Sequence, residues 1–204
     1  MSLARLLQLA SPTLPVGAYS YSQGLEAAVE AGIVKDAASA QEWIADVLEF
    51  SVARFEAPVL WRLIHGESLN ELFLASRETA ELRAETLQMG HSLKKLIEEL
   101  GLGTMPEDEP AFPTAFAFAV LKLNVEPRAA LVAYLWSWLE NQVMAALKAV
   151  PLGQTAGQKM LLSLGSRLEK IADDAEGTEL RNFAPGLAVL SAQHETQYSR
   201  LFRS

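Results

Sequence analysis

The 204-residue sequence predicts an all-α fold, a single-domain helical bundle packed around a central apolar helix. Three observations predict this fold class. Apolar residues recur at three- and four-residue spacings along most of the chain. No segment has the sustained Val, Ile and Thr alternation that marks β-strands. Half of the residues are hydrophobic, so residues 1–204 can build one sizeable core.

The first irregular segment of the chain is ASPTLPVGAYSYSQGLE, residues 10–26. Its prolines cannot continue a helix, and its glycines tolerate backbone angles that other residues avoid. We therefore expect a fixed, non-helical course. The hydroxyl and amide groups of residues 19–23 stand where a new helix would begin. That position suits either helix capping or contact with a partner, and the sequence leaves both open.

Two capping boxes predict the next helix starts, SAQE at residues 39–42 and SLNE at residues 68–71. The apolar spacing that follows the first box runs from residue 43 to residue 64. Pro58 lies inside this stretch, so we expect a kink or break there.

An amphipathic helix is predicted over residues 82–100, with its end at Gly101. The acidic, proline-bounded stretch at residues 103–113 should form a loop within the single domain.

Pro127 fits the first position of a later helix, and residues 131–147 are apolar nearly all round. This helix should be the central one, and it should end before Pro151. A further helix is predicted over residues 160–171, followed by a solvated acidic loop at residues 173–179.

Composition excludes several classes of protein. The net charge of -8 argues against a nucleic-acid partner, which would favour a basic surface. The absence of cysteine excludes disulfides and thiolate ligands, and a cytoplasmic location is the default expectation. The longest apolar runs fall well short of the roughly 18 residues of a membrane span, so we expect a soluble protein without a membrane partner.

No catalytic or metal-binding motif is complete. Two metal ligands on one helical face lie three or four positions apart, and none of the three histidines, His65, His91 and His194, has a histidine or carboxylate at that spacing. Ligands that converge in three dimensions or across a dimer axis remain open. Residues 90–94 (GHSLK) resemble a nucleophile elbow but lie inside a predicted helix.

Residues 153–160 (GQTAGQKM) resemble a damaged phosphate-binding loop. They lack the Lys-Ser/Thr pair that would hold phosphate and magnesium, so no nucleotide site is predicted. Gly153 and Gly157 instead suggest a close approach of another backbone.

Three segments together resemble the UreF family of urease accessory proteins. They are LLQLASPTLPVGAYSYSQGLEAAVEAG, LENQVMAALKAVPLGQTAGQKML and SAQHETQYSRLFRS, and their order spans almost the whole chain. The resemblance implies an all-α dimer that scaffolds UreD (also called UreH) and the GTPase UreG on apo-urease and regulates GTP-dependent nickel delivery. It implies no enzymatic activity of its own and no tightly bound cofactor. Nickel would be handled transiently by the complex.

The family motifs also suggest partner-binding residues in this chain. The candidates are Tyr19, Ser20, Ser22, Gln23 and Glu26 in the first segment, Lys148, Gln154 and Gln158 in the second, and His194, Glu195, Tyr198, Ser199, Arg200 and Phe202 in the third. Residues 194–204 should form a partner-binding tail that is mobile in the free protein and becomes ordered on UreD.

Two other functions compete with the scaffold. One is a small helical nickel-binding carrier, which needs several nitrogen or oxygen ligands in one place. The other is a helical hydrolase that uses scattered carboxylates, for example Glu26 with a histidine, and it needs a concave pocket with neighbouring acid and base groups.

Overall fold

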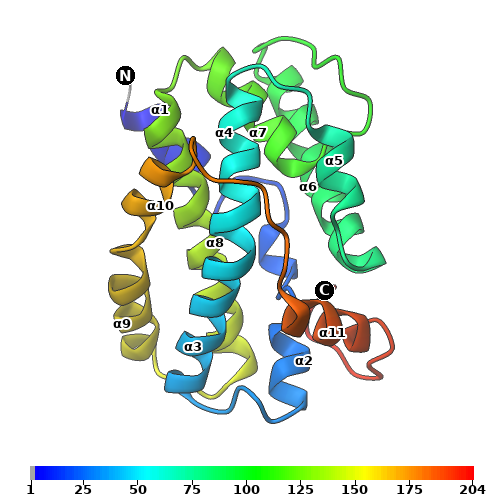
Figure 1. Ribbon diagram of the computed structural model, residues 1–204, viewed down its shortest axis with the longest axis vertical. Coiled ribbons are helices and arrows are strands. Elements are labelled where there is room, and N and C mark those ends of the chain that lie inside the picture. Colours follow the sequence, from blue (N-terminus) through cyan, green and yellow to red (C-terminus); the bar gives the residue numbers. More distant parts are fainter. Residues whose placement is uncertain (1–2) are drawn as a thin grey trace.

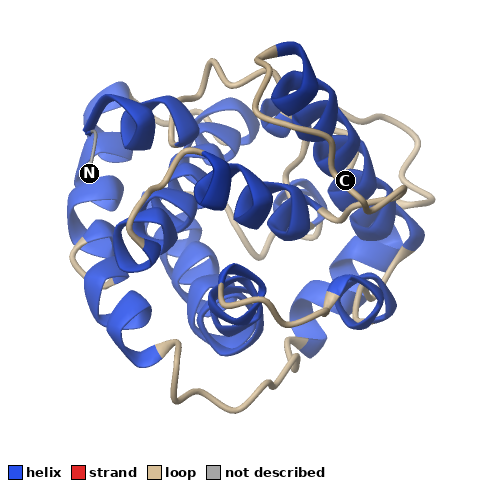
Figure 2. Ribbon diagram, turned by 90° about the horizontal axis from the view of Figure 1, so that it is seen from above, coloured by secondary structure: helices blue, strands red, loops and turns tan. Residues whose placement is uncertain are grey.

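A computed structural model describes residues 3–204, and its regular structure is helical. Figure 2 shows helices joined by loops, and no strand occurs in the described range. The predicted all-α class is therefore confirmed. The elements are α1 (Leu3–Leu9), η1 (Ala18–Ser20), α2 (Leu25–Glu30), α3 (Ala37–Val47), η2 (Leu48–Glu56), α4 (Ala57–Ile64), α5 (Asn70–Ala75), α6 (Ala80–Glu99), α7 (Phe112–Lys122), α8 (Pro127–Ala149), α9 (Gln154–Gly165), α10 (Leu168–Asp174) and α11 (Pro185–His194).

The central helix of the bundle is α8, as the sequence predicts. Pro127 occupies its first turn, where the missing N–H needs no partner. Leu131, Leu135 and Leu139 are fully buried in the core. Helices α1, α2, α3, α4, α9 and α10 all pack against α8 (Figure 1).

The long helical run from α3 to α4 differs from the prediction in two ways. Asp36 caps α3, not Ser39, because the Asp36 carboxylate accepts the Ser39 N–H and the Ser39 hydroxyl accepts the Asp36 N–H. The chain also stays helical through Pro58. The π-helical segment η2 precedes it, with the Ala57 N–H bonded to the Val52 carbonyl, so Pro58 falls in the first turn of α4.

The second predicted capping box is also wrong. Helix α5 begins at Asn70, and no side chain caps it. The Asn70 side chain instead binds the acidic loop: Nδ2 donates to the Glu109 carbonyl at 3.2 Å, and Oδ1 accepts the Ala111 N–H at 2.8 Å. These bonds tie the loop before α7 to α5, which agrees with a loop inside one domain.

Helix α6 matches its predicted extent and packs closely against the chain before α7. A Cβ atom added to Gly90 would lie 1.9 Å from the Pro110 carbonyl oxygen. Only a glycine permits this approach. Gly90, the first residue of the segment that resembles a nucleophile elbow, therefore has a packing role.

The chain after Pro151 departs from the prediction. The single helix expected at residues 160–171 is divided into α9 and α10, and Asp173 belongs to α10 and pairs with Arg128. Gly157 faces side chains of α8, not a backbone, and Gly153 is open. No helix within residues 3–204 has both the length and the apolar character to cross a bilayer.

Candidate functional site

The C-terminal segment, residues 195–204, lies against the first part of the chain. Figure 1 shows the C-terminus beside α11 and close to α2. The Glu26 carboxylate in α2 accepts the N–H of Leu201 at 2.6 Å and of Phe202 at 2.9 Å. Glu26 and the Phe202 side chain are both buried. Because hydrogen bonds to a buried carboxylate are stronger than neutral ones, the segment is docked on the body of the protein.

Two serines hold the end of the same segment. The backbone N–H and the hydroxyl of Ser22 both donate to the Ser204 carbonyl oxygen, at 2.7 and 2.6 Å. The Arg203 N–H donates to the Ser20 carbonyl oxygen at 2.8 Å. We call Ser20, Ser22 and Glu26 the C-terminal seat. All of these bonds involve main-chain atoms of the segment, so the seat recognises its backbone.

A tight turn connects η1 to α2 within the C-terminal seat. Element η1 ends at Ser20, and Gln23 (φ 52°) and Gly24 (φ 78°) both take left-handed backbone before α2. Glycine adopts such angles without steric strain, whereas other residues adopt them rarely. A Cβ at Gly24 would lie 3.2 Å from Leu187 Cδ1, so α11 packs directly on the turn.

A charged cluster joins the seat to α6 and α11. His194, the last residue of α11, is 0% exposed. Its Nε2 lies 3.2 Å from Glu26 Oε2, and its Nδ1 lies 2.6 Å from Glu81 Oε2. The other Glu81 oxygen accepts a hydrogen bond from Arg200 at 2.6 Å. Among residues 3–204, no group of three His, Asp or Glu side chains is arranged to hold a metal ion.

A second polar cluster lies between α6 and α8. The buried Glu85 carboxylate accepts hydrogen bonds from Gln23 Nε2 and Ser204 Oγ, both at 2.8 Å. The Trp138 indole donates to Gln23 Oε1 at 2.8 Å. Burial raises the pKa of Glu85 to about 7, because loss of water disfavours the charged form more than the two hydrogen bonds favour it. The Glu85 carboxyl group therefore changes from protonated to ionised near neutral pH.

The third polar group is Glu56 with its two partners. One Glu56 oxygen accepts from Arg77 at 2.9 Å and the other from the Tyr134 hydroxyl at 3.0 Å. The Arg77 guanidinium also lies 4.3 Å from the centre of the Phe73 ring. Burial raises the pKa of Tyr134 well above its usual value, and the Glu56 charge adds to this, so Tyr134 remains a donor.

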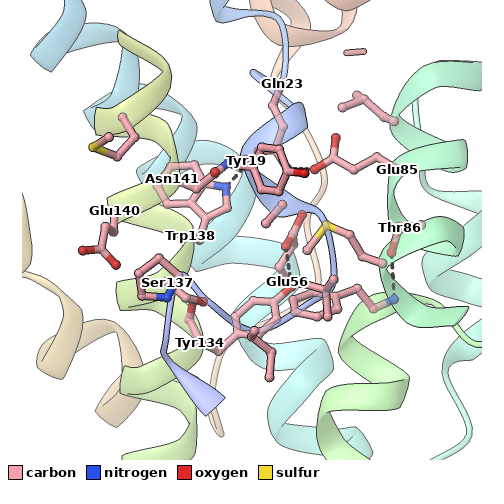
Figure 3. Close-up of a pocket in the computed structure, with 18 of the residues that line it drawn as sticks. Tyr19, Gln23, Glu56, Glu85, Thr86, Tyr134, Ser137, Trp138, Glu140 and Asn141 are labelled. Atoms are coloured by element: carbon pink, nitrogen blue, oxygen red, sulfur yellow. Dashed lines mark hydrogen bonds between the residues drawn. The ribbon is translucent and has the colours of Figure 1, made fainter. Parts of the chain in front are cut away.

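Glu56 and Glu85 line a cavity of about 200 Å³. Figure 3 shows side chains of η1, α6 and α8 around it, with Tyr19 and Glu140 among them. Much of the remaining wall is apolar and includes Leu82. Each of the four carboxylate oxygens of Glu56 and Glu85 already accepts a hydrogen bond from the protein. Neither Glu56 nor Glu85 therefore has an unengaged carboxylate oxygen in the cavity.

Comparison with known proteins identifies the family. A family model described as UreF matches residues 34–165, more than half of the chain. This chain belongs to the UreF family. Proteins named "Urease accessory protein UreF" are similar to it over their whole length. The protein from Janthinobacterium sp. (strain Marseille) is 54% identical over all of this chain and 98% of its own. The protein from Azoarcus sp. (strain BH72) is 54% identical over 100% and 96%, and that from Dechloromonas aromatica (strain RCB) is 53% identical over 100% and 98%.

The structure brings the first and third motifs of this UreF-family chain together. Seat residues Ser22 and Glu26 are buried beneath the C-terminal segment, whereas Tyr19 is 67% exposed. Lys148 joins the second motif to both, with its Nζ 5.9 Å from the Tyr19 ring centre and 5.6 Å from that of Phe202.

The other candidates of the second motif lie apart. Gln154 and Gln158 are exposed on α9. Within residues 3–204, no hydrogen bond joins either of them to the C-terminal seat. Their role in partner binding stays a prediction.

The sequence predicts a mobile C-terminal tail, whereas the structure docks this segment on the body of the protein. His194 belongs to α11 and is buried between Glu26 of α2 and Glu81 of α6. Phe202 is also buried, with its N–H bonded to Glu26 and its ring near Lys148. The sequence does not reveal these long-range contacts. The exposed residues of the segment are Glu195, Thr196, Tyr198, Ser199, Arg200, Leu201 and Arg203. The UreF-family chain thus docks the segment and leaves one face of it exposed.

Sequence reasoning missed Glu56, Arg77, Glu81 and Glu85. A signal for Glu85 was present, because it lies three positions after Leu82 and four before Met89, on the apolar face of α6. A carboxylate in that position must be buried or disrupt the helix packing. The partners of the other three are distant in sequence and carry no comparable pattern.

Proposed function

We propose that this chain is a urease accessory protein that acts in urease maturation as a non-catalytic scaffold. In this role a cytoplasmic homodimer joins UreD (UreH) and the GTPase UreG on apo-urease and regulates GTP-dependent nickel delivery. The observation that carries the proposal is the family match, together with relatives of the same name that align over nearly their full length. Nickel is cargo of the complex in this proposal, and no cofactor is held tightly.

The surface that we assign to UreD is the outward face of the docked C-terminal segment. Tyr198 is fully exposed and Leu201 is 70% exposed, although both are large side chains. Tyrosine often contributes disproportionately to binding energy, and Leu201 adds apolar area that a partner can bury. Because the seat fixes the backbone beneath them, these side chains are already positioned before a partner arrives, which lowers the entropic cost of binding.

The hydrolase alternative has one point in its favour, the cavity with the raised pKa of Glu85. The buried carboxylates of Glu56 and Glu85 are each engaged by two protein donors, so neither of them is poised to take a proton from a substrate. We therefore favour the scaffold.

The test is capture of UreD and UreG by the purified chain. The wild type should co-elute with both partners. Leu201→Ala should reduce UreD capture at least tenfold with an unchanged melting temperature, because it removes apolar area that UreD would bury and keeps the backbone N–H that donates to Glu26.

The matched control is Leu162→Ala, another exposed leucine, 81% exposed on α9, which should not change UreD capture. Full capture by Leu201→Ala would exclude the assigned surface. Failure of the wild type to retain correctly folded partners would exclude the scaffold itself.

A further inference from the structure

The two carboxylates that face His194 constrain the protonation state of its ring. Both ring nitrogens lie within hydrogen-bond distance of a carboxylate oxygen, Nε2 of Glu26 and Nδ1 of Glu81. An ionised carboxylate can only accept hydrogen bonds. With both carboxylates ionised, both contacts are hydrogen bonds only when the ring carries a proton on each nitrogen, as an imidazolium.

The surrounding charges fit that form. Glu26 in α2 and Glu81 in α6 face the ring, and Arg200 from the C-terminal segment binds Glu81. Two negative groups and two positive groups then balance. Glu195, next to His194 in the chain, turns its carboxylate to the Glu81 backbone N–H. Glu85, one turn beyond Glu81, faces Ser204.

A neutral ring would leave this cluster unbalanced. One ring nitrogen would present a lone pair to a carboxylate oxygen, and the two glutamates and Arg200 would keep one uncompensated negative charge. The same two carboxylates hold the C-terminal segment, Glu26 through two backbone N–H groups and Glu81 through Arg200. Loss of the proton therefore acts on the segment through Glu26 and Glu81, because it removes the hydrogen bond that orients one of these carboxylates.

We propose that His194, protonated on both nitrogens, is a positioning residue that orients Glu26 and Glu81 to hold residues 195–204, and that loss of one proton releases the segment. Release exposes the buried Phe202 side chain and the C-terminal seat. The inference adds a regulation to the segment that the proposed function assigns to UreD. Its test needs no partner, so it can fail while the scaffold stands, and the reverse.

The first measurement is ¹⁵N NMR of histidine side chains in the whole folded chain between pH 5.5 and 9. The chain has only three histidines, and the signal that disappears in His194→Gln identifies the residue. Both ring nitrogens of His194 should have the chemical shifts of imidazolium while the segment is docked. A neutral ring with one protonated nitrogen in the docked segment at pH 6 would overturn the proposal.

The second measurement is the rate of trypsin cleavage after Arg200 and Arg203, normalised at each pH to a free peptide of residues 195–204. The normalised rate should rise at least tenfold as His194 loses its second proton. A rate that stays flat through this titration would also overturn the proposal.

Two variants complete the test. Glu81→Gln keeps the shape of the side chain and removes one charge that favours the imidazolium, so release should occur at lower pH. His91→Gln, at an exposed histidine of α6, should leave the release unchanged. If Glu81→Gln releases the segment at the same pH as the wild type, the proposed role of the cluster is wrong.

Discussion

Glu26 accepts hydrogen bonds from the N–H groups of Leu201 and Phe202, and one of its oxygens also lies 3.2 Å from Nε2 of His194. A buried carboxylate with so many partners resists substitution, because any replacement leaves donors unpaired. The residue combines two tasks, stability of the fold and placement of the C-terminal segment.

Glu26→Gln should lower the free energy of unfolding by about 2 kcal/mol, since it replaces one acceptor oxygen with an amide donor that faces another donor. Urea denaturation measures this loss. The matched control is Glu30→Gln, at the exposed end of α2, which should be nearly neutral. Equal stability of the two variants would contradict the role assigned to Glu26.

A second prediction at the residue scale concerns the effect of Glu85 on stability at different pH values. Burial raises its pKa from an ordinary value of 4.5 to about 7. The folded protein therefore keeps a proton that the unfolded chain releases. The stabilisation from this proton is complete below pH 4.5 and is lost as the pH rises through 7, and its size is roughly 3 kcal/mol at most.

Glu85→Gln should abolish this part of the pH dependence. Urea denaturation of the wild type and the variant between pH 4.5 and 8 measures the difference in unfolding free energy. The wild type should lose stability relative to Glu85→Gln as the pH rises. Glu67→Gln, at an exposed position, should instead follow the wild type.

At the scale of elements, the periodicity of apolar residues predicts where a long helix lies better than it predicts whether that helix is interrupted. It placed α6 and α8 because each has a long apolar pattern that only an α-helix fits. It could not find η2, where the hydrogen bonds reach back five residues and not four, because no residue type marks this change. It also merged α9 with α10, because the apolar spacing continues across the break between them.

Gly90→Ala tests the closest approach between elements. The added methyl group would clash with the Pro110 carbonyl, a backbone atom that cannot rotate away, so α6 and the chain before α7 must separate. The melting temperature should fall, with a loss of about 3 kcal/mol in unfolding free energy.

The matched control is Gly186→Ala in α11, where an added methyl group meets open space. It should be neutral or stabilising by about 0.5 kcal/mol, because alanine favours helix more than glycine does. A mild effect of Gly90→Ala would mean that the two elements are not packed as described.

At the scale of the whole molecule, the fold brings residues 20–26 and residues 194–204 together from opposite parts of the chain. The sequence predicted the all-α class and the central helix, because both depend on local patterns. It identified both motifs but not their mutual contact. Long-range pairings such as Ser22 with Ser204 have no local signature, so burial of the segment could not be predicted.

Truncation after Gln193 tests this long-range contact. Removal of an undocked tail would not change stability. In this structure, however, the truncation removes His194, Arg200 and the backbone N–H groups that contact Glu26 and Glu81. We expect the melting temperature to fall by about 10 °C, measured by circular dichroism. Truncation after Gln197 keeps His194 and should cost less. Unchanged melting in both would show that the docked segment adds no stability.

The main-chain recognition of residues 201–204 bears on how this protein can vary. The contacts of Ser20, Ser22 and Glu26 reach backbone atoms, which every amino acid other than proline supplies alike. Substitutions at outward positions such as Tyr198 and Leu201 therefore leave the anchorage intact. Sequence drift can reshape the outer face for a changed partner while the inner face stays constant, so folding and recognition can evolve separately within the same few residues.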